Sequence, residues 1–249
     1  MLSDVAARAS LPLTDGSAGP PGRRLTAAQE QVVREMALFA TVGDAVAESL
    51  VREMRSRVVL RGEVLYRSGD PGDSLFVVLA GCLQAFRGDR YGRVQTLEIL
   101  TAGGIVGELS LVDRLPRTAT VAALHDAELA VLEFDRLEGV LERHPQMAIA
   151  LLRYFSGRLR RANEAVANMA LMDVRARVAK TVLELAARFG RPQPAGIEVD
   201  HGLSQEDLAR YVGASREMVN RALADLQARH VLRLRPGGML ILRRADLES

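Results

Sequence analysis

The sequence predicts an α+β chain in which a β-roll is followed by one long helix and then by two short helices and a β-hairpin. Three observations predict this. Short apolar runs punctuated by glycine fill Arg57–Phe86, a pattern typical of strands joined by tight turns. Apolar residues three and four positions apart recur from Leu152 to Met169, which is the period of an α-helix. Two helix starts separated by a glycine turn lie within Ser204–Leu226.

Composition limits the class of protein. The 249 residues are 48% hydrophobic, enough for a sizeable core and two modest domains. No apolar run is long enough to cross a bilayer, and the amino terminus has no basic region followed by an apolar core. We therefore expect no membrane partner and a cytoplasmic location. Because the net charge is only +2, any surface that binds nucleic acid must be local.

The single cysteine, Cys82, excludes an intramolecular disulfide and any cysteine-rich metal or iron–sulfur site. It lies within an apolar strand pattern, so we expect a small buried core residue.

Changes of pattern divide the chain into four segments. Residues 1–24 mix alanine, serine, glycine and proline without a period, which predicts a flexible leader. Residues 25–143 are expected to form a domain that starts with helices, the first capped by Thr26, and continues as the β-roll. Residues 144–171 are expected to form the long helix. Residues 172–249 are expected to form a second domain, with a helix over Val174–Phe189 and a loop over Gly190–Gly196.

The segment Gly107–Val121 reads G-E-L-S-L-V-D-R-L-P-R-T-A-T-V and places Glu108 and Arg117 nine residues apart. A carboxylate accepts hydrogen bonds from a ribose, and a guanidinium forks onto the two free oxygens of a cyclic phosphodiester. A short helical turn begun at Gly107 directs backbone N–H groups at the same phosphate. This segment predicts a site for a small anionic nucleotide. The alternative is a surface ion pair between Glu108 and Arg117, which contributes little energy.

A narrow apolar stripe follows the predicted long helix in steps of three and four residues. Its members are Leu152, Phe155, Leu159, Ala162, Val166 and Met169. Such a heptad seam is best buried against an identical helix, as in a two-stranded coiled coil, so it predicts a homodimer. The alternative is that the stripe packs on the chain's own β-roll.

The carboxyl-terminal segment has the pattern of a helix-turn-helix. Ser204 caps a first helix, Val212-Gly213-Ala214 makes a tight turn, and Ser215 caps a second helix. Two short alternating strands around Pro236-Gly237-Gly238 follow and predict a wing.

Arg216, Glu217 and Arg221 are expected on the exposed amino-terminal side of the second helix, which would enter the major groove. Arginine binds guanine O6 and N7, and glutamate accepts from a cytosine amino group. A carboxylate would otherwise be repelled by phosphates, so Glu217 favours base recognition over general charge attraction. Ser215 and Asn220 are candidates for phosphate contacts.

Three segments carry a resemblance to known proteins. G-D-P-G-D-S-L-F-V-V-L-A-G with the Gly107–Val121 segment resembles the cyclic-nucleotide-binding domain, and S-R-E-x-V-x-R resembles the recognition helix of the cyclic-AMP receptor and fumarate-nitrate-reductase regulator (Crp/Fnr) family. The resemblance covers Leu25 to the carboxyl end. It implies an amino-terminal sensor, a dimerisation helix and a winged helix-turn-helix. The implied partners are double-stranded DNA with half-sites resembling TGTGA, a second copy of the chain, and RNA polymerase.

The resemblance also implies the type of sensor. Intact Gly107, Glu108, Arg117 and Thr118, with Leu109 and Ser110 between them, favour a cyclic mononucleotide. The four histidines are scattered, and each is expected as a surface or capping residue, so no metal or haem is expected. Where cyclic-AMP-responsive members carry a threonine followed by serine or asparagine, this chain has Ala162-Asn163. Asn163 can bind a base edge, whereas Ala162 cannot. Cyclic AMP is favoured over cyclic GMP on the family's general habit.

We therefore expect a homodimeric transcription regulator controlled by a cyclic nucleotide. One alternative is a regulator with the same fold that binds DNA without a ligand. An enzyme is the other, but the sequence has no nucleophile with an adjacent base, no carboxylate pair and no metal-ligand cluster.

Overall fold

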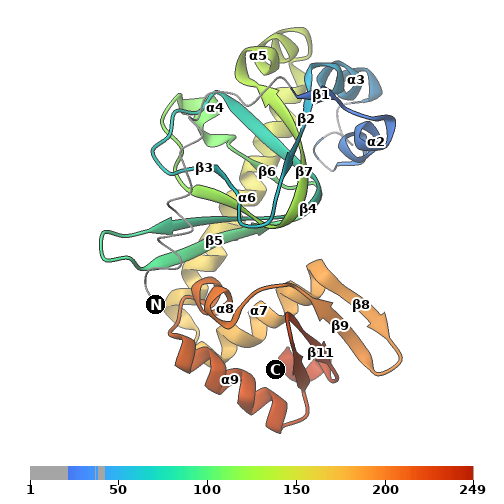
Figure 1. Cartoon of the computed structure of the whole chain (residues 1–249). Coiled ribbons are helices and arrows are strands. Elements are labelled where there is room, and N and C mark those ends of the chain that lie inside the picture. Colours follow the sequence, from blue (N-terminus) through green and yellow to red (C-terminus); the bar gives the residue numbers. More distant parts are fainter. Residues whose placement is uncertain (1–21, 37, 39–42, 249) are drawn as a thin grey trace. The chain divides into compact units, whose positions relative to one another are not determined.

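A computed structural model describes residues 22–36, 38 and 43–248 (Figure 1). The described residues group into two compact units. The first holds residues up to Arg87 together with Glu98–Arg158, and the second holds Gly88–Leu97 and the chain from Leu159 onward. Most of the predicted leader lies outside the described residues.

Helices and one antiparallel sheet make up the amino-terminal part of the chain. In order, its elements are β1 (Arg23–Arg24), α2 (Ala27–Glu35), α3 (Asp44–Glu53), β2 (Arg55–Val59), β3 (Val64–Tyr66), β4 (Ser74–Gly88), β5 (Val94–Leu100), β6 (Ile105–Val106), α4 (Leu109–Asp113), β7 (Thr120–Glu133), α5 (Phe134–Arg143) and α6 (Gln146–Leu171). The strand order is β1-β2-β7-β4-β5, with β3 also paired to β7 and β6 to β4. The predicted β-roll is confirmed.

The last two residues of the predicted leader pair with the sheet of the β-roll. Arg23 and Arg24 form β1, which pairs with Ser56 and Arg55 at the start of β2. The composition of residues 1–24, which is rich in turn residues, did not predict this pairing. A strand of two residues is determined by the strand it pairs with rather than by its own sequence.

Strand β4 explains why the roll has two cores. Leu75, Val77 and Leu79 belong to the cluster shared with the helices, whereas Phe76 and Val78 belong to a second cluster. Successive side chains of a strand point to opposite faces, so the continuous run L-F-V-V-L is buried on both sides. Cys82, further along β4, is 2% exposed, which confirms its predicted role.

Helix α6 carries two apolar stripes. Met147 and Ala150 are buried in the helix-side core, and Leu151 and Tyr154 pack against it. Leu152, on the other stripe, is 60% exposed. Leu152, at the start of the predicted seam, therefore does not pack on the β-roll, because a neighbouring face of the helix makes that contact, and the two alternatives for the seam as a whole stay predictions.

The carboxyl-terminal part combines three helices with a small sheet. Its elements are α7 (Val174–Phe189), β8 (Gly190–Gln193), β9 (Gly196–Asp200), α8 (Gln205–Val212), α9 (Arg216–Ala228), β10 (Leu232–Arg235), β11 (Gly238–Ile241) and the 3-10 helix η1 (Arg244–Leu247). The sheet order is β10-β11-β9-β8. The predicted loop over Gly190–Gly196 is wrong, since most of it is the β8–β9 hairpin. Pro192 lies on the edge strand β8, where proline is tolerated.

The predicted helix caps are confirmed. The Thr26 side chain accepts from the Gln29 amide in a capping box, and Ser204 does the same with Asp207. Ser215 accepts from the amide of Met218 at the start of α9. Gly213 ends α8 with a φ of 71°, a left-handed conformation that glycine adopts without strain. Strands β10 and β11 flank the predicted turn and form the wing.

Candidate nucleotide-binding site and nucleic-acid interface

The Gly107–Val121 segment leaves β6, makes the short helix α4 and returns into β7. Gly107 has a φ of +86°, and a Cβ there would lie 2.4 Å from Nη1 of Arg117. A Cβ on Gly72, in the connection between β3 and β4, would lie 2.5 Å from the Cβ of Ser110. Both glycines therefore make room for the segment to close around the Arg117 side chain.

Arg117 is buried, with 4% of its surface exposed. Its Nη1 donates to the Gly107 carbonyl at 2.9 Å and its Nη2 to the Ser74 carbonyl at 2.7 Å. Nε is buried with no acceptor among the described residues. The guanidinium lies 4.4 Å from the centroid of the Tyr66 ring, a cation–π contact. Burial lowers the pKa of Arg117, although Tyr66 and nearby carboxylates act in the opposite direction.

Glu108 is also buried, at 4% exposure. It forms an ion pair with Arg158 rather than with Arg117, so the alternative of a surface pair between Glu108 and Arg117 is wrong. Burial raises the pKa of Glu108 above its ordinary value, although Arg158 acts in the opposite direction.

Arg158, on α6, is a site residue that the sequence pattern did not identify. Its Nη2 lies 2.6 Å from a carboxylate oxygen of Glu98, and its Nη1 pairs with Glu108 and donates to the Ile105 carbonyl at 3.3 Å. Burial lowers the pKa of Arg158, but the two carboxylates more than offset this and raise it overall. The signal in the sequence was its spacing of four from Tyr154, which puts both on the stripe that faces the roll.

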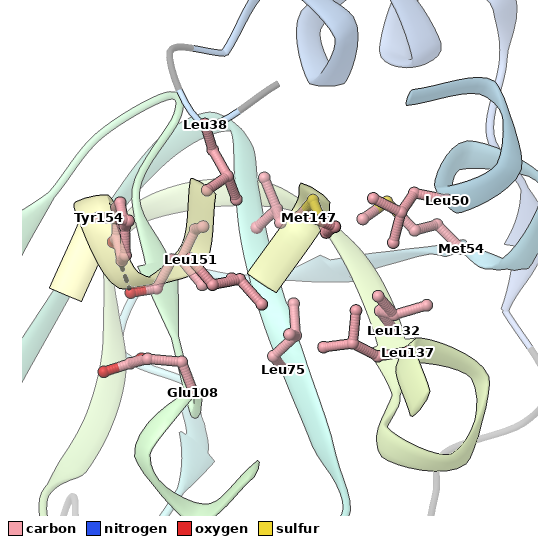
Figure 2. Close-up of a pocket in the computed structure, with 12 residues that line it drawn as sticks. Leu38, Leu50, Met54, Leu75, Glu108, Leu132, Leu137, Met147, Leu151 and Tyr154 are labelled. Carbon is pink, nitrogen blue, oxygen red and sulfur yellow. Dashed lines mark hydrogen bonds between the residues drawn. The ribbon is translucent and has the colours of Figure 1, made fainter. Parts of the chain in front are cut away.

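A small cavity of about 20 Å³ lies beside Glu108. Apolar side chains line it, and Glu108 and Tyr154 lie at one end, away from Leu50 and Met54 (Figure 2). The Tyr154 hydroxyl donates to the Ile105 carbonyl at 3.5 Å. This volume holds one water molecule at most, so the cavity itself does not hold a nucleotide.

The other predicted nucleotide contacts divide into two groups. Ser110 is buried at 2% exposure, while Leu109 and Thr118 are exposed. Asn163 is exposed and belongs to the second unit, so its contact with a base stays a prediction.

The histidines do not gather. His201 is buried rather than on the surface, and its Nδ1 accepts from the Leu203 amide at 3.0 Å. Within the described parts of the chain no three histidine, cysteine, aspartate or glutamate side chains come together as a metal site requires. None of the described helices is long and apolar enough to span a membrane.

The predicted DNA-reading residues all lie at the start of α9 and are exposed. They are Ser215, Arg216, Glu217, Asn220 and Arg221. Val219, Ala222 and Leu223 on the opposite side of the helix are buried. Hydrogen bonding from its own backbone amide and from Ser215 lowers the pKa of Glu217, which keeps this side chain a carboxylate acceptor.

The predicted seam residues of α6 are solvent-accessible in the single chain. Leu159 is 63% exposed, Val166 68% and Met169 47%, and Ala162 is exposed, while Phe155 is half-buried.

Comparison with known proteins identifies the family. The cyclic nucleotide-binding domain family matches residues 56–144, and the Crp-like helix-turn-helix domain family matches residues 176–249. A CRP-like cAMP-activated global transcriptional regulator of Mycobacterium tuberculosis is 34% identical over 212 residues, which cover 85% of this chain and 95% of the relative. The chain belongs to the Crp/Fnr family.

Two further Crp/Fnr relatives agree with this. The cyclic AMP receptor protein of Thermus thermophilus is 31% identical, over 78% of this chain and 86% of that protein. The solved structure of a c-di-GMP-responsive global regulator of Xanthomonas campestris is 26% identical and covers 80% of this chain and 99% of that one, with a TM-score of 0.70. The Crp/Fnr family comprises transcription regulators rather than enzymes. This protein is accordingly a Crp-like, cyclic-nucleotide-binding, DNA-binding transcription regulator.

Proposed function

We propose that the protein is a homodimeric, cytoplasmic transcription regulator in which cyclic AMP raises the affinity for a palindromic DNA site. The observation that carries the effector is the buried guanidinium of Arg117, whose Nε has no acceptor among the described residues. A buried cation is costly unless an anion compensates it. A cyclic phosphodiester supplies one negative charge and an acceptor oxygen for this N–H.

We assign the nucleotide to the Gly107–Val121 segment, with the ribose on Glu108. The proposed contacts are Gly107, Glu108, Leu109, Ser110, Arg117, Thr118 and Asn163. Two relatives carry cyclic AMP in their names, which favours this ligand. Cyclic GMP is the first alternative. The Xanthomonas regulator responds to c-di-GMP, so that nucleotide belongs in the same test.

The exposed seam of α6 supports the homodimer, because a helix in solution rarely leaves a continuous apolar stripe uncovered. Pairing two chains along it would present two copies of α9 to successive major grooves of a palindrome. Ser215, Arg216, Glu217, Asn220 and Arg221 are the proposed DNA contacts. RNA polymerase is the proposed partner at the promoter.

The ion pair between Arg158 and Glu108 favours a second candidate, a regulator that binds DNA without a ligand. In that case Arg158 would permanently satisfy the carboxylate that is assigned to the ribose, and the Arg117 cation would serve only to hold the Gly107 and Ser74 carbonyls.

Isothermal titration calorimetry of one preparation with cyclic AMP, cyclic GMP and c-di-GMP distinguishes the candidates. Saturable heat with cyclic AMP at the lowest dissociation constant supports the proposal. If cyclic GMP or c-di-GMP binds more tightly, that nucleotide is the effector instead of cyclic AMP. If none of the three gives a heat of binding, the ligand-independent regulator is favoured.

A further inference from the structure

Arg177, in the first turn of α7, donates to backbone carbonyls from two separate places in the chain. Its Nη1 donates to Met172 at 2.9 Å, its Nε to Val212 at 3.2 Å and its Nη2 to Gly213 at 3.3 Å. Met172 comes directly after α6, and Val212-Gly213 is the end of α8. All of these residues belong to the second unit.

These carbonyls are the kind that need an outside donor. The last four carbonyls of a helix have no partner within it, and a cation there is also favoured by the helix dipole. One planar guanidinium with five donors in a fixed fork satisfies two helix ends at once, whereas the compact ammonium of a lysine lacks this spread of donors. Arg177 therefore caps α6 and α8 together.

The two ends have different tasks in the proposed function. Helix α6 carries the dimer seam and Asn163, while Val212-Gly213 is the turn that sets α9 relative to α8. The Asp173 side chain, which accepts from the Ala176 amide at 2.8 Å, starts α7 immediately after Met172. The α6–α7 junction and the helix-turn-helix turn thus meet at one side chain.

We propose that Arg177 is a positioning residue that fixes the helix-turn-helix turn to the carboxyl end of α6, so that a change at this end of α6 reaches the recognition helix α9. This inference rests on the proposed function, because a ligand response must pass along α6 to become a DNA response. Arg177 itself contacts neither ligand nor DNA in this role.

The test compares Arg177→Met with Arg175→Met in the full-length protein. Arg175 lies on the same helix turn and is exposed, so its substitution removes an arginine without removing the two caps. Fluorescence anisotropy measures DNA affinity with and without saturating cyclic AMP.

Ordinary allosteric coupling changes affinity about 5- to 150-fold. We expect that ratio to be kept in Arg175→Met and to fall below about threefold in Arg177→Met, with Arg177→Lys between them because it keeps the charge but not the fork. An unchanged ratio in Arg177→Met would overturn the proposal.

A second measurement, hydrogen exchange, tests in the absence of ligand whether Arg177 caps both helix ends. The amides of Met172 and Gly213 bond to Asn168 and Ala209 in the last turns of α6 and α8. Hydrogen exchange at both should accelerate together in Arg177→Met, or in Arg177→Lys if the methionine variant does not fold, and not in Arg175→Met. Acceleration at only one end, or at neither, overturns the shared cap. If no cyclic nucleotide changes the DNA affinity of the parent protein, the proposed function is overturned. The hydrogen-exchange result then still tests whether Arg177 caps both helix ends.

Discussion

At the scale of single residues, Arg117 has two tasks in one guanidinium. Two of its nitrogens hold the Gly107 and Ser74 carbonyls, and the third is left for a ligand. Arginine suits this double task because its donors are rigidly spaced and it stays charged when buried. The residue that would bind the phosphate therefore also shapes the segment that surrounds it.

We predict that Arg117→Leu abolishes nucleotide binding and also lowers stability. Each buried carbonyl left without a donor costs about 1–3 kcal/mol, and loss of a charge-assisted hydrogen bond to a phosphate, about 1.5–3 kcal/mol, weakens binding on the order of 10- to 100-fold. Calorimetry and urea unfolding measure the two effects. Arg90→Leu, at an exposed position, is the control and should match the parent in both. If Arg117→Leu binds the nucleotide as tightly as the parent does, the Gly107–Val121 segment has only a structural role.

Glu108 should make stability depend on pH. Burial raises its folded-state pKa above the ordinary 4.5, so the folded chain binds this proton more tightly than the unfolded chain does. The contribution is therefore present as the pH falls towards 4.5 and is lost as the pH rises through the raised pKa. We predict that the free energy of unfolding of the parent, minus that of Glu108→Gln, grows as the pH is lowered from 7 to 4.5. Exposed Glu164 supplies the control, since Glu164→Gln should give a flat difference, and a flat difference for Glu108→Gln would refute the prediction.

Glu108 and Arg117 could be singled out from the sequence, because few other needs place a carboxylate and a guanidinium in a glycine-bounded apolar segment, and their binding of a nucleotide stays a prediction. Arg158 could not. The heptad steps of α6 describe the face that stays exposed, and a second stripe one position away faces the roll. Two overlapping periods on one helix cannot be separated without knowing what lies on each side.

At the scale of elements, α6 serves two surfaces, one against the roll and one exposed. We predict that Val166→Glu dissociates the proposed dimer, because it places two carboxylates opposite each other in an apolar seam. Ala167→Glu adds the same charge next to the seam on an exposed position and should leave the dimer intact. Sedimentation velocity distinguishes monomer from dimer. A parent that sediments as a monomer, or a Val166→Glu variant that stays dimeric, would exclude this seam as the interface.

For the recognition helix α9, we predict that Glu217→Ala relaxes base preference more than it weakens total binding. The carboxylate is repelled by phosphates, so it contributes through a base rather than through the backbone. Arg216→Ala should instead cost about 1–3 kcal/mol on the preferred site. Selection from random DNA measures preference, and anisotropy measures affinity. If the Glu217→Ala protein selects the same DNA sequences as the parent, Glu217 does not contribute to base recognition.

The elements themselves were largely predictable, since caps at Thr26, Ser204 and Ser215 fix where helices start. The β8–β9 hairpin was missed because Gly190, Pro192 and Gly196 read as loop residues. On an edge strand such residues are tolerated, and pairing of β9 with β11 defines the sheet. Register between distant strands is a tertiary property that a local pattern does not contain. The predicted segment boundaries at residues 24, 143 and 171 stay predictions.

At the scale of the whole molecule, the proposed site lies mainly in the first unit and the DNA-reading helix in the second, and α6 belongs to both. Regulation then requires a free energy of coupling between the two sites. A ligand shifts the equilibrium only by its difference in affinity for the two states. Exchange of the Arg158 contact on Glu108 for a ribose hydroxyl is the local change that would supply such a difference.

The most direct test measures the affinity of the protein for its selected palindromic DNA with and without cyclic AMP, in the parent and in Arg117→Leu. We predict that cyclic AMP raises the affinity of the parent about 5- to 150-fold and does not change that of Arg117→Leu. Equal affinities with and without cyclic AMP in the parent would contradict a cyclic-AMP-controlled regulator.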